Sequence, residues 1–184
     1  MIIIGIMGKS GTGKSTVIEE LCKDERFHYV KSHSTREPRT NDPRDLKTHT
    51  FVNEEFYLNS KDKVISLFLG NGYRNWTDES NFDEKKINLY AIDSQAFVKL
   101  VKEFPEWETF GIYLKIDEAT RLMRFLNRND DKAFDTEEHL SEEPLNQIGN
   151  KEILNINNLS PEEVAEKIRG KIWKVDWKHL MKEE

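Results

Sequence analysis

Residues 2–15 read IIIGIM followed by GKSGTGKS, and this stretch predicts the fold of the chain. The apolar run 2–7 fits a strand that is buried on both faces, as in a parallel sheet. The next eight residues fit G-x-x-x-x-G-K-[ST], in which glycines let backbone N–H groups approach phosphate oxygens. Residues 15–21 then form an amphipathic helical pattern, whose positive end would face the phosphates. Strand, loop and helix in this order predict an α/β P-loop NTPase, a three-layer fold with a parallel sheet core.

The loop also predicts a binding site for Mg²⁺ and ATP. Lys14 offers a positive charge to the β and γ phosphates, and the hydroxyl of Ser15 is a ligand for Mg²⁺. Thr16 more simply begins the helix, but we keep it in the predicted set. A chance glycine-rich turn is the alternative, and the flanking strand and helix weigh against it. The predicted ATP-binding residues here are Gly8, Ser10, Gly11, Thr12, Gly13, Lys14, Ser15 and Thr16.

Length and composition indicate one soluble domain. A chain of 184 residues suits a single domain, 1–184, with small inserted lobes. The formal net charge of −6 argues against nonspecific binding to nucleic acid or membranes through overall charge. Cys22 is the only cysteine, which favours a reducing compartment. The apolar start is too short for a membrane span or a signal sequence. We therefore expect a cytoplasmic protein, either a monomer or a homodimer.

The rest of the chain alternates between polar stretches and apolar runs. We expect a polar loop at 32–48, a short helix at 53–58 capped by Asn53, and a strand at 64–69 before the turn signal at 70–72. Residues 129–150 are polar and acidic, and we expect them to be mobile. From residue 87 the pattern is that of βα units. The expected strands there are 87–92, 110–116 and 153–156, and the expected helices are 94–104, 118–127 and one that begins with a capping box at Ser160.

Residues 34–39, STREPR, resemble the T-T-R-x-P-R segment of the guanylate kinase family of nucleoside monophosphate kinases. An aromatic strand at 50–52 and the helix after Asn53 also follow as in that family. The resemblance implies an acceptor-binding lobe over 32–88 and a lid over 125–150. It also implies transfer of the ATP γ-phosphoryl group to a nucleoside or deoxynucleoside 5′-monophosphate, with Mg²⁺ as cofactor.

The acceptor site follows partly from chemistry and partly from the resemblance. A monophosphate carries about two negative charges, which Arg36 and Arg39 can bind bidentately. The alternative is a solvated charged loop in which these arginines pair with Glu37, Asp42 and Asp45. His49 stands where the family has a tyrosine, and Asn75 where it has a serine or threonine. The resemblance implies acceptor-binding roles for Ser32, Arg36, Arg39, His49, Tyr73, Asn75 and Asp93.

The base preference of the acceptor is left open by the sequence. The family's base-reading glutamate should lie within 63–69, and that segment contains no acid. A carboxylate there would accept hydrogen bonds from guanine. Another nucleotide, including a deoxynucleotide, is therefore compatible with the pattern.

Asp93 ends an apolar run, 89–92, in the manner of a Walker B strand that supports Mg²⁺. A simple helix cap is the equal alternative. Arg124 and Arg128 share one helix face and match the family's R-L-x-x-R, so they join Lys14 as predicted catalytic residues. Arg121 is out of step with that pair, and we interpret it as a solvated helix charge.

Asn157 matches an asparagine that helps to hold adenine in the family, with a plain turn residue as the alternative. Two other functions remain open. One is a guanylate-kinase-like module that binds proteins with little or no catalysis. The other is a P-loop kinase that acts on another phosphorylated small molecule.

Overall fold

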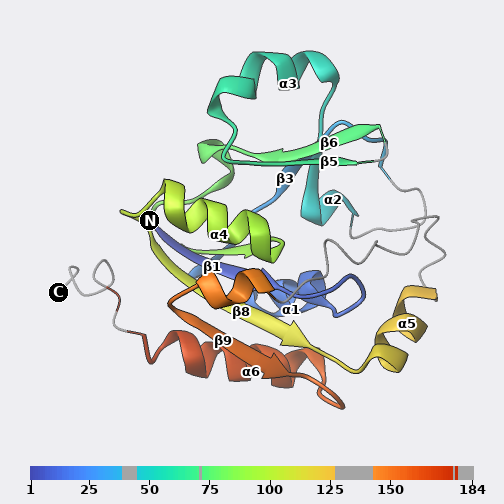
Figure 1. The fold of residues 1–184 in the computed structure, drawn as a ribbon, viewed down its shortest axis with the longest axis vertical. Helices are drawn as coiled ribbons and strands as arrows, with labels where there is room; N and C mark the ends of the chain where they lie inside the picture. Colours follow the sequence, from blue (N-terminus) through green and yellow to red (C-terminus); the bar gives the residue numbers. More distant parts are fainter. Residues whose placement is uncertain (39–44, 71, 127–142, 176, 178–184) are drawn as a thin grey trace.

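The computed structural model describes residues 1–38, 45–70, 72–126, 143–175 and 177. At its centre lies a five-stranded sheet in the order β2-β7-β1-β8-β9 (Figure 1). Every pair of neighbouring strands in it is parallel. Its strands are β1 (Ile2–Met7), β2 (Phe27–Tyr29), β7 (Ile87–Ala91), β8 (Glu108–Lys115) and β9 (Lys151–Asn155). The predicted parallel core is confirmed, and all six residues of its central strand β1 are buried.

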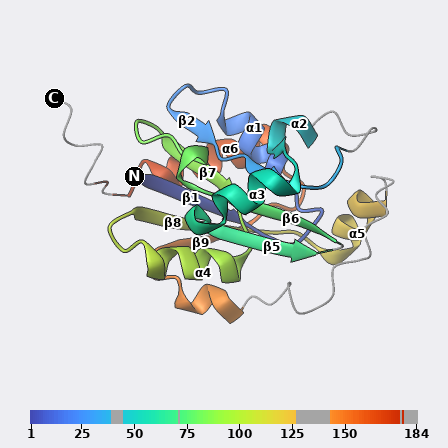
Figure 2. The same cartoon turned by 90° about the horizontal axis from the view of Figure 1, so that it is seen from above.

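Helices cover both faces of this sheet, which makes three layers (Figure 2). Alternate residues of β1 face opposite sides. Ile4 belongs to the core with α1 (Lys14–Leu21) and α6 (Pro161–Ile172). Ile3 belongs to the other core, with α4 (Ser94–Glu103) and residues beside the short helix η4 (Glu143–Gln147). The remaining helix of this part, α5 (Glu118–Leu126), follows β8.

The beginning of α6 shows why its start could be predicted. The Ser160 hydroxyl accepts from the Glu163 N–H at 3.2 Å, and the Glu163 carboxylate accepts from the Ser160 N–H at 2.7 Å. Pro161 occupies the first turn. The predicted capping box is therefore confirmed.

A second, four-stranded sheet forms the small lobe at the top of Figure 1. Its order is β4-β3-β6-β5. The β5–β6 hairpin turns at Gly72, whose φ of +78° suits glycine. A hydrogen bond of 2.9 Å between Thr77 and Tyr90 links this lobe to the main sheet. The lobe contains β3 (Ser32–Ser34), α2 (Asp45–Thr48), β4 (His49–Phe51), α3 (Glu54–Ser60), η1 (Lys61–Lys63), β5 (Ser66–Gly70), β6 (Tyr73–Thr77) and η2 (Glu79–Asn81).

Several local predictions were wrong. The expected loop 32–48 contains strand β3, with buried Ser34, and the single helical turn α2, with buried Asp45. Strand β2 was missed because three residues carry no detectable period. Of the expected mobile stretch 129–150, residues 143–150 are described and include the helix η4, where Leu145 is buried, whereas residues 129–142 lie outside the described residues. No helix in the described ranges is long and apolar enough to cross a membrane.

Candidate functional site

The phosphate loop lies between the end of β1 and the start of α1. Gly8, Gly11 and Gly13 have φ values of +142°, +87° and +97°, which side chains rarely allow. A Cβ on Gly8 would lie 2.7 Å from the carbonyl oxygen of Leu114, and one on Gly11 would lie 3.0 Å from that of Arg121. The loop therefore needs glycine at positions 8 and 11 for both conformation and space, and at position 13 for conformation alone.

Hydrogen bonds within the loop hold this shape. The N–H and hydroxyl of Thr12 both donate to the carbonyl of Lys9, at 3.2 and 2.9 Å. The ammonium of Lys14 donates to the carbonyls of Gly8 and Lys9, at 2.7 and 3.2 Å. Lys14 thus lies across its own loop, where it would meet a bound phosphate.

Ser15 and Thr16 form the first turn of α1, as their predicted roles require. Beside Ser15 lies the largely buried phenol of Tyr29. Burial raises the pKa of Tyr29 to about 12, with a hydrogen bond to Ser15 as the opposing influence. Tyr29 therefore stays protonated at physiological pH. Ser10 lies at the apex of the loop, and its carbonyl contacts α5.

That contact comes from Arg121, and it overturns our interpretation of this residue as a solvated charge. Arg121 is only 2% exposed. Its Nη1 donates to the carbonyl of Ser10 at 3.0 Å, and its Nε donates to Glu118 at 2.9 Å. Arg121 holds the pKa of Glu118 below its usual value. The one signal in the sequence is the Glu118–Arg121 spacing, since residues three apart meet on a helix.

Of the two predicted lid arginines, the structure describes only Arg124. Arg124 is exposed, and its Nη1 lies 3.4 Å from the carbonyl of Thr12 at the phosphate loop. Arg128 lies outside the described residues. The structure therefore places one of the pair beside the loop.

Asp93 follows β7, the strand next to β1, so it emerges one strand away from the phosphate loop. Its carboxylate accepts from the Ala96 N–H at 2.8 Å and caps α4. The side chain is also exposed. Mg²⁺ commonly keeps several waters and takes one or two protein oxygens besides phosphate. Ser15 and Asp93 offer oxygens of the kind that Mg²⁺ takes, and their binding of the ion remains a prediction. No cluster of three metal-ligating side chains occurs within the described residues.

The predicted acceptor arginine Arg36 lies at the end of β3 and is largely buried. Its guanidinium forms a bidentate ion pair with Asp45, and its centre lies 5.0 Å from the ring centroid of Phe51. The side chains of Arg36 and Asp45 are 11% and 2% exposed. The pairing with Asp45 that we named as an alternative is therefore present. Arg39 lies outside the described residues.

The other predicted acceptor residues lie on strands of the small sheet. Ser32 pairs with His49 across β3 and β4, and Tyr73 pairs with Gly70 beside the turn. His49 also lies 3.6 Å from Asp45. Asn75 belongs to β6, and its side-chain oxygen is buried without a hydrogen-bond partner among the described residues. These side chains share a lobe, as the resemblance implies, and their contacts with a nucleotide remain predictions.

Asn157 performs the structural role that we named as its alternative. Its side-chain oxygen accepts from the Asp117 N–H at 2.8 Å and so ties the end of β9 to the turn before α5. Asn158, with φ of +58°, completes the turn. A contact with adenine remains a prediction.

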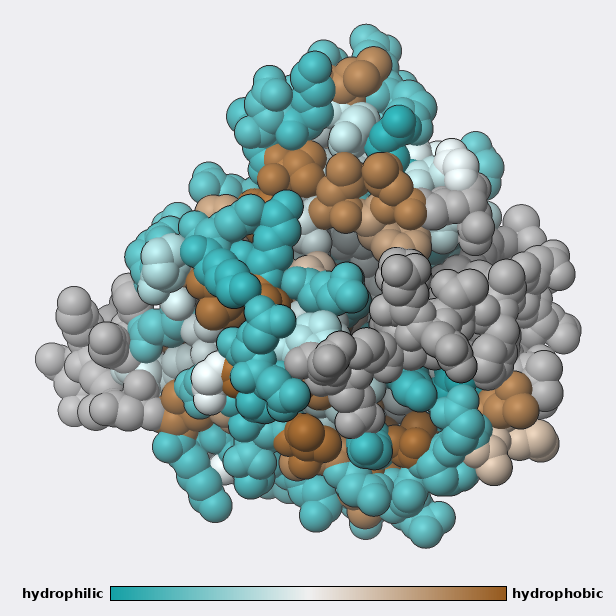
Figure 3. All heavy atoms as spheres, viewed as in Figure 1, coloured by the Kyte–Doolittle hydropathy of each residue, from teal (hydrophilic) through white to brown (hydrophobic). Residues whose placement is uncertain are grey.

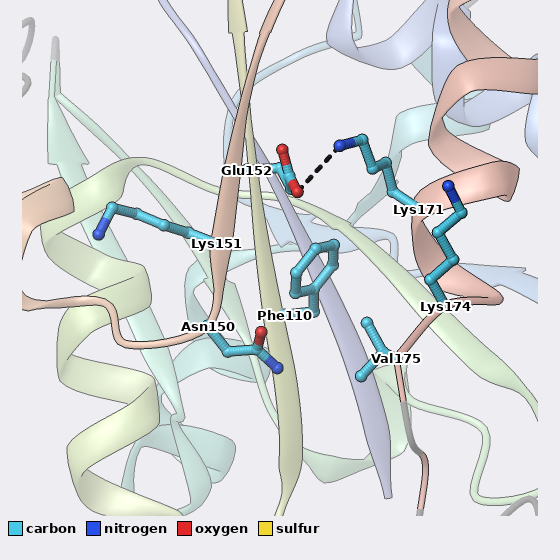
Figure 4. A pocket seen from close by; sticks show the side chains of 7 residues that line it. All are labelled: Phe110, Asn150, Lys151, Glu152, Lys171, Lys174 and Val175. Atoms are coloured by element: carbon cyan, nitrogen blue, oxygen red, sulfur yellow. Dashed lines mark ion pairs between the residues drawn. The ribbon is translucent and has the colours of Figure 1, made fainter.

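Two surface features lie apart from these residues. Figure 3 shows apolar side chains gathered on the small lobe, where α3 and the edge strand β5 carry exposed Phe56, Leu58, Leu67, Phe68 and Leu69. Figure 4 shows a pocket of about 480 Å³ near the amino ends of β8 and β9, opposite the phosphate-loop edge. An ion pair of 3.0 Å between Glu152 and Lys171 crosses it. None of the predicted site residues that the structure describes lines this pocket, which is formed by Phe110, Asn150, Lys151, Glu152, Lys171, Lys174 and Val175.

Comparisons with known proteins agree with this geometry. The sequence matches no family model. A solved structure of guanylate kinase from Anaplasma phagocytophilum superposes with a TM-score of 0.62 at 18% identity, over 94% of this chain and 84% of that one, which supports the fold. A guanylate kinase from Clostridium tetani is 29% identical over 146 residues, 76% of this chain and 67% of that enzyme.

Two further relatives differ in how much of their length is matched. The alignment with the guanylate kinase of Schizosaccharomyces pombe, 36% identical over 73 residues, spans 37% of this chain and only 36% of that enzyme. A guanylate kinase from Prochlorococcus marinus subsp. pastoris is 32% identical over 149 residues, 76% of this chain and 78% of that enzyme. With the phosphate loop, the lobe and this coverage together, the chain belongs to the guanylate kinase family.

Proposed function

We propose that this chain transfers the γ-phosphoryl group of Mg²⁺–ATP to a nucleoside or deoxynucleoside 5′-monophosphate. The observation that carries the proposal is the phosphate loop, shaped by three glycines with positive φ and with Lys14 folded across it, at the carboxyl end of the central strand of a parallel sheet. The relatives named guanylate kinases support the same activity.

On the donor side, backbone N–H groups of the loop would bind the phosphate oxygens, and Lys14 would neutralise charge on the transferring group. Ser15, with Asp93 as the second predicted ligand, would hold Mg²⁺, which would supply positive charge that offsets the charge of the phosphates. Arg124 lies beside the loop, and we propose that Arg128 joins it over the triphosphate. We assign Asn157 to the adenine. The attacking atom is an anionic phosphate oxygen, so the reaction needs no general base.

On the acceptor side, the monophosphate would bind Arg36, with Arg39 as its predicted partner. Because Arg36 is paired with Asp45, an acceptor phosphate must share this guanidinium or displace the carboxylate. We assign the remaining contacts with the acceptor nucleotide to Ser32, His49, Tyr73 and Asn75. Guanosine monophosphate is the first acceptor to test, because the relatives are guanylate kinases. Other bases stay within the proposal, because residues 63–69 contain no acid that could read guanine.

The test is ADP release from Mg²⁺–ATP with each ribo- and deoxynucleoside monophosphate in turn. We expect one acceptor to stimulate release strongly and Lys14→Ala to abolish it. Lys99→Ala is the control, because the Lys99 ammonium lies in α4, pairs with Glu103 at 3.7 Å and serves no predicted role in the site. ATP binding without stimulation by any acceptor would contradict the proposal and favour the protein-binding module or another phosphorylated substrate.

A further inference from the structure

Arg121 joins the apex of the phosphate loop to the first turn of α5. It spans the Ser10 carbonyl at 3.0 Å and the Glu118 carboxylate at 2.9 Å, and its side chain is 3% exposed. Its own backbone oxygen would lie 3.0 Å, and its Cγ 3.3 Å, from a Cβ on Gly11. The loop apex and α5 are therefore in close contact.

The bond to Ser10 also orients the next peptide group. In a planar trans peptide the C=O and the N–H point in opposite directions. Arg121 holds the Ser10 carbonyl toward α5, so the Gly11 N–H points away from α5. A phosphate loop works through N–H groups that are oriented before the ligand arrives. The contact thus fixes the direction of one donor at the loop apex.

Glu118 makes this contact specific to arginine. Its carboxylate accepts hydrogen bonds from two of the three guanidinium nitrogens of Arg121, and the third nitrogen donates to the Ser10 carbonyl. Lysine carries the same charge as a single point and lacks this planar fork. The Lys9 ammonium approaches the same carboxylate at 3.9 Å, which adds a second link between loop and helix.

We propose that Arg121 is a positioning residue for the donor triphosphate, which sets the apex of the phosphate loop by tying the Ser10 carbonyl to α5. This inference rests on the proposed function, since it assumes that the loop binds Mg²⁺–ATP. Arg121 has no predicted contact with the substrates and acts through the loop. Loss of the hydrogen bond between Arg121 and Ser10 should lower the affinity for the donor triphosphate and leave the affinity for the acceptor unchanged.

The matched control is Arg169 in α6. It also bonds a carboxylate three residues earlier, Glu166 at 3.1 Å, and a backbone carbonyl of another helix, Glu20 at 3.2 Å. Its contacts are of the same kind as those of Arg121, but Glu20 lies in the body of α1 rather than at the loop apex. Arg169→Met therefore reports the general cost of removing such an arginine.

The experiment titrates the full chain and its variants with Mg²⁺ and the fluorescent methylanthraniloyl derivative of ATP, and follows their thermal unfolding. A hydrogen bond to a charged group suggests that Arg121→Met weakens binding about tenfold or more. In turnover assays KM for ATP should rise while KM for the acceptor stays constant. Arg169→Met should bind like the wild type.

Arg121→Lys is a second variant for the same measurements, in case Arg121→Met does not fold. The positioning role predicts weaker binding in Arg121→Lys at an unfolding temperature near that of the wild type. Equal binding by the lysine variant and the wild type would overturn the inference. The binding step needs no acceptor, so a wild type that binds ATP but transfers no phosphate would fail only the proposed function.

Discussion

The donor side and the acceptor lobe of this protein are prepared for ligand in different ways. The phosphate loop is shaped by backbone, through three glycines with positive φ and hydrogen bonds to its own carbonyls. The acceptor lobe depends on side chains, and its central arginine, Arg36, already has a carboxylate partner in Asp45. In our proposal, a phosphate would meet a site shaped by backbone in the first region and a competing carboxylate in the second.

This difference indicates where binding should be sensitive to substitution. Backbone donors cannot be moved by a rotamer change, so the donor site should depend on the glycines and on what holds the loop. The acceptor site should depend on the balance between the acceptor phosphate and Asp45 for the same guanidinium. Substitutions in one region should therefore leave the affinity of the other unchanged.

The largest effect is expected from Gly11→Ala. The φ of +87° and the 3.0 Å approach to the Arg121 oxygen force strain or movement of the loop. Strain of about 1–3 kcal/mol corresponds to a loss of ATP affinity of roughly five- to 150-fold. Titration with Mg²⁺–ATP measures it.

Gly170→Ala is the control, because Gly170 lies in α6 and its Cβ would meet nothing within 4 Å. That variant should gain up to about 1 kcal/mol of stability and bind ATP normally. Normal ATP affinity in Gly11→Ala would show that the loop is not shaped by its backbone.

The next effect concerns Arg36→Lys. Lysine keeps the charge but loses the bidentate grip, so KM for the acceptor should rise about tenfold or more while KM for ATP stays constant. Initial rates at varied acceptor and varied ATP separate the two.

Arg74→Lys is the matched control in the same lobe, since Arg74 pairs with Glu54 and lies 4.8 Å from the Tyr57 ring centroid. An equal change in acceptor KM for both variants would mean that Arg36 is only a structural residue. A change confined to Arg36→Lys would sharpen the contrast between the two regions.

A smaller effect separates the two roles of Asp93. Asparagine caps a helix as well as aspartate does, whereas alanine costs about 1 kcal/mol at a cap. Asp93→Asn should therefore keep the unfolding temperature and raise the Mg²⁺ concentration needed for half-maximal rate, by about tenfold if the carboxylate acts through water. Asp93→Ala should both lower the unfolding temperature and raise the Mg²⁺ concentration needed for half-maximal rate. An unchanged Mg²⁺ requirement in Asp93→Asn would leave Asp93 as a cap alone.

The contrast also explains what the sequence could and could not predict. The phosphate loop was predictable because its geometry is local and each glycine has a conformational reason to be there. The partner of Arg36 was named only as an alternative, because Asp45 lies nine residues away in a stretch that looks like a polar loop. Arg121 was misjudged because its partner Ser10 is distant in sequence. No pattern within α5 shows that this position faces the loop.

The smallest effect tests whether the acceptor lobe is sensitive to pH apart from its binding site. His33 on β3 is 7% exposed, lies 5.1 Å from the Trp76 ring centroid, and approaches Asp78 at 3.5 Å. Burial lowers its pKa from the ordinary value of 6.5, although Asp78 opposes this. The unfolded chain therefore takes up a proton that the folded chain resists.

Stability should consequently fall as the pH drops through 6.5, with a slope of at most about 1.4 kcal/mol per pH unit for one proton. Denaturant unfolding of wild type and His33→Gln between neutral pH and mildly acidic pH measures it, and the difference between the two curves should shrink toward acid. His28→Gln is the control, because the His28 ring bonds the backbone oxygen of Asn81 at 2.9 Å, whereas His33 bonds the side chain of Asn81 at 3.1 Å. A constant difference between wild type and His33→Gln would mean that His33 stabilises the lobe by packing without any change in protonation, and pH would then act on the lobe only through other groups.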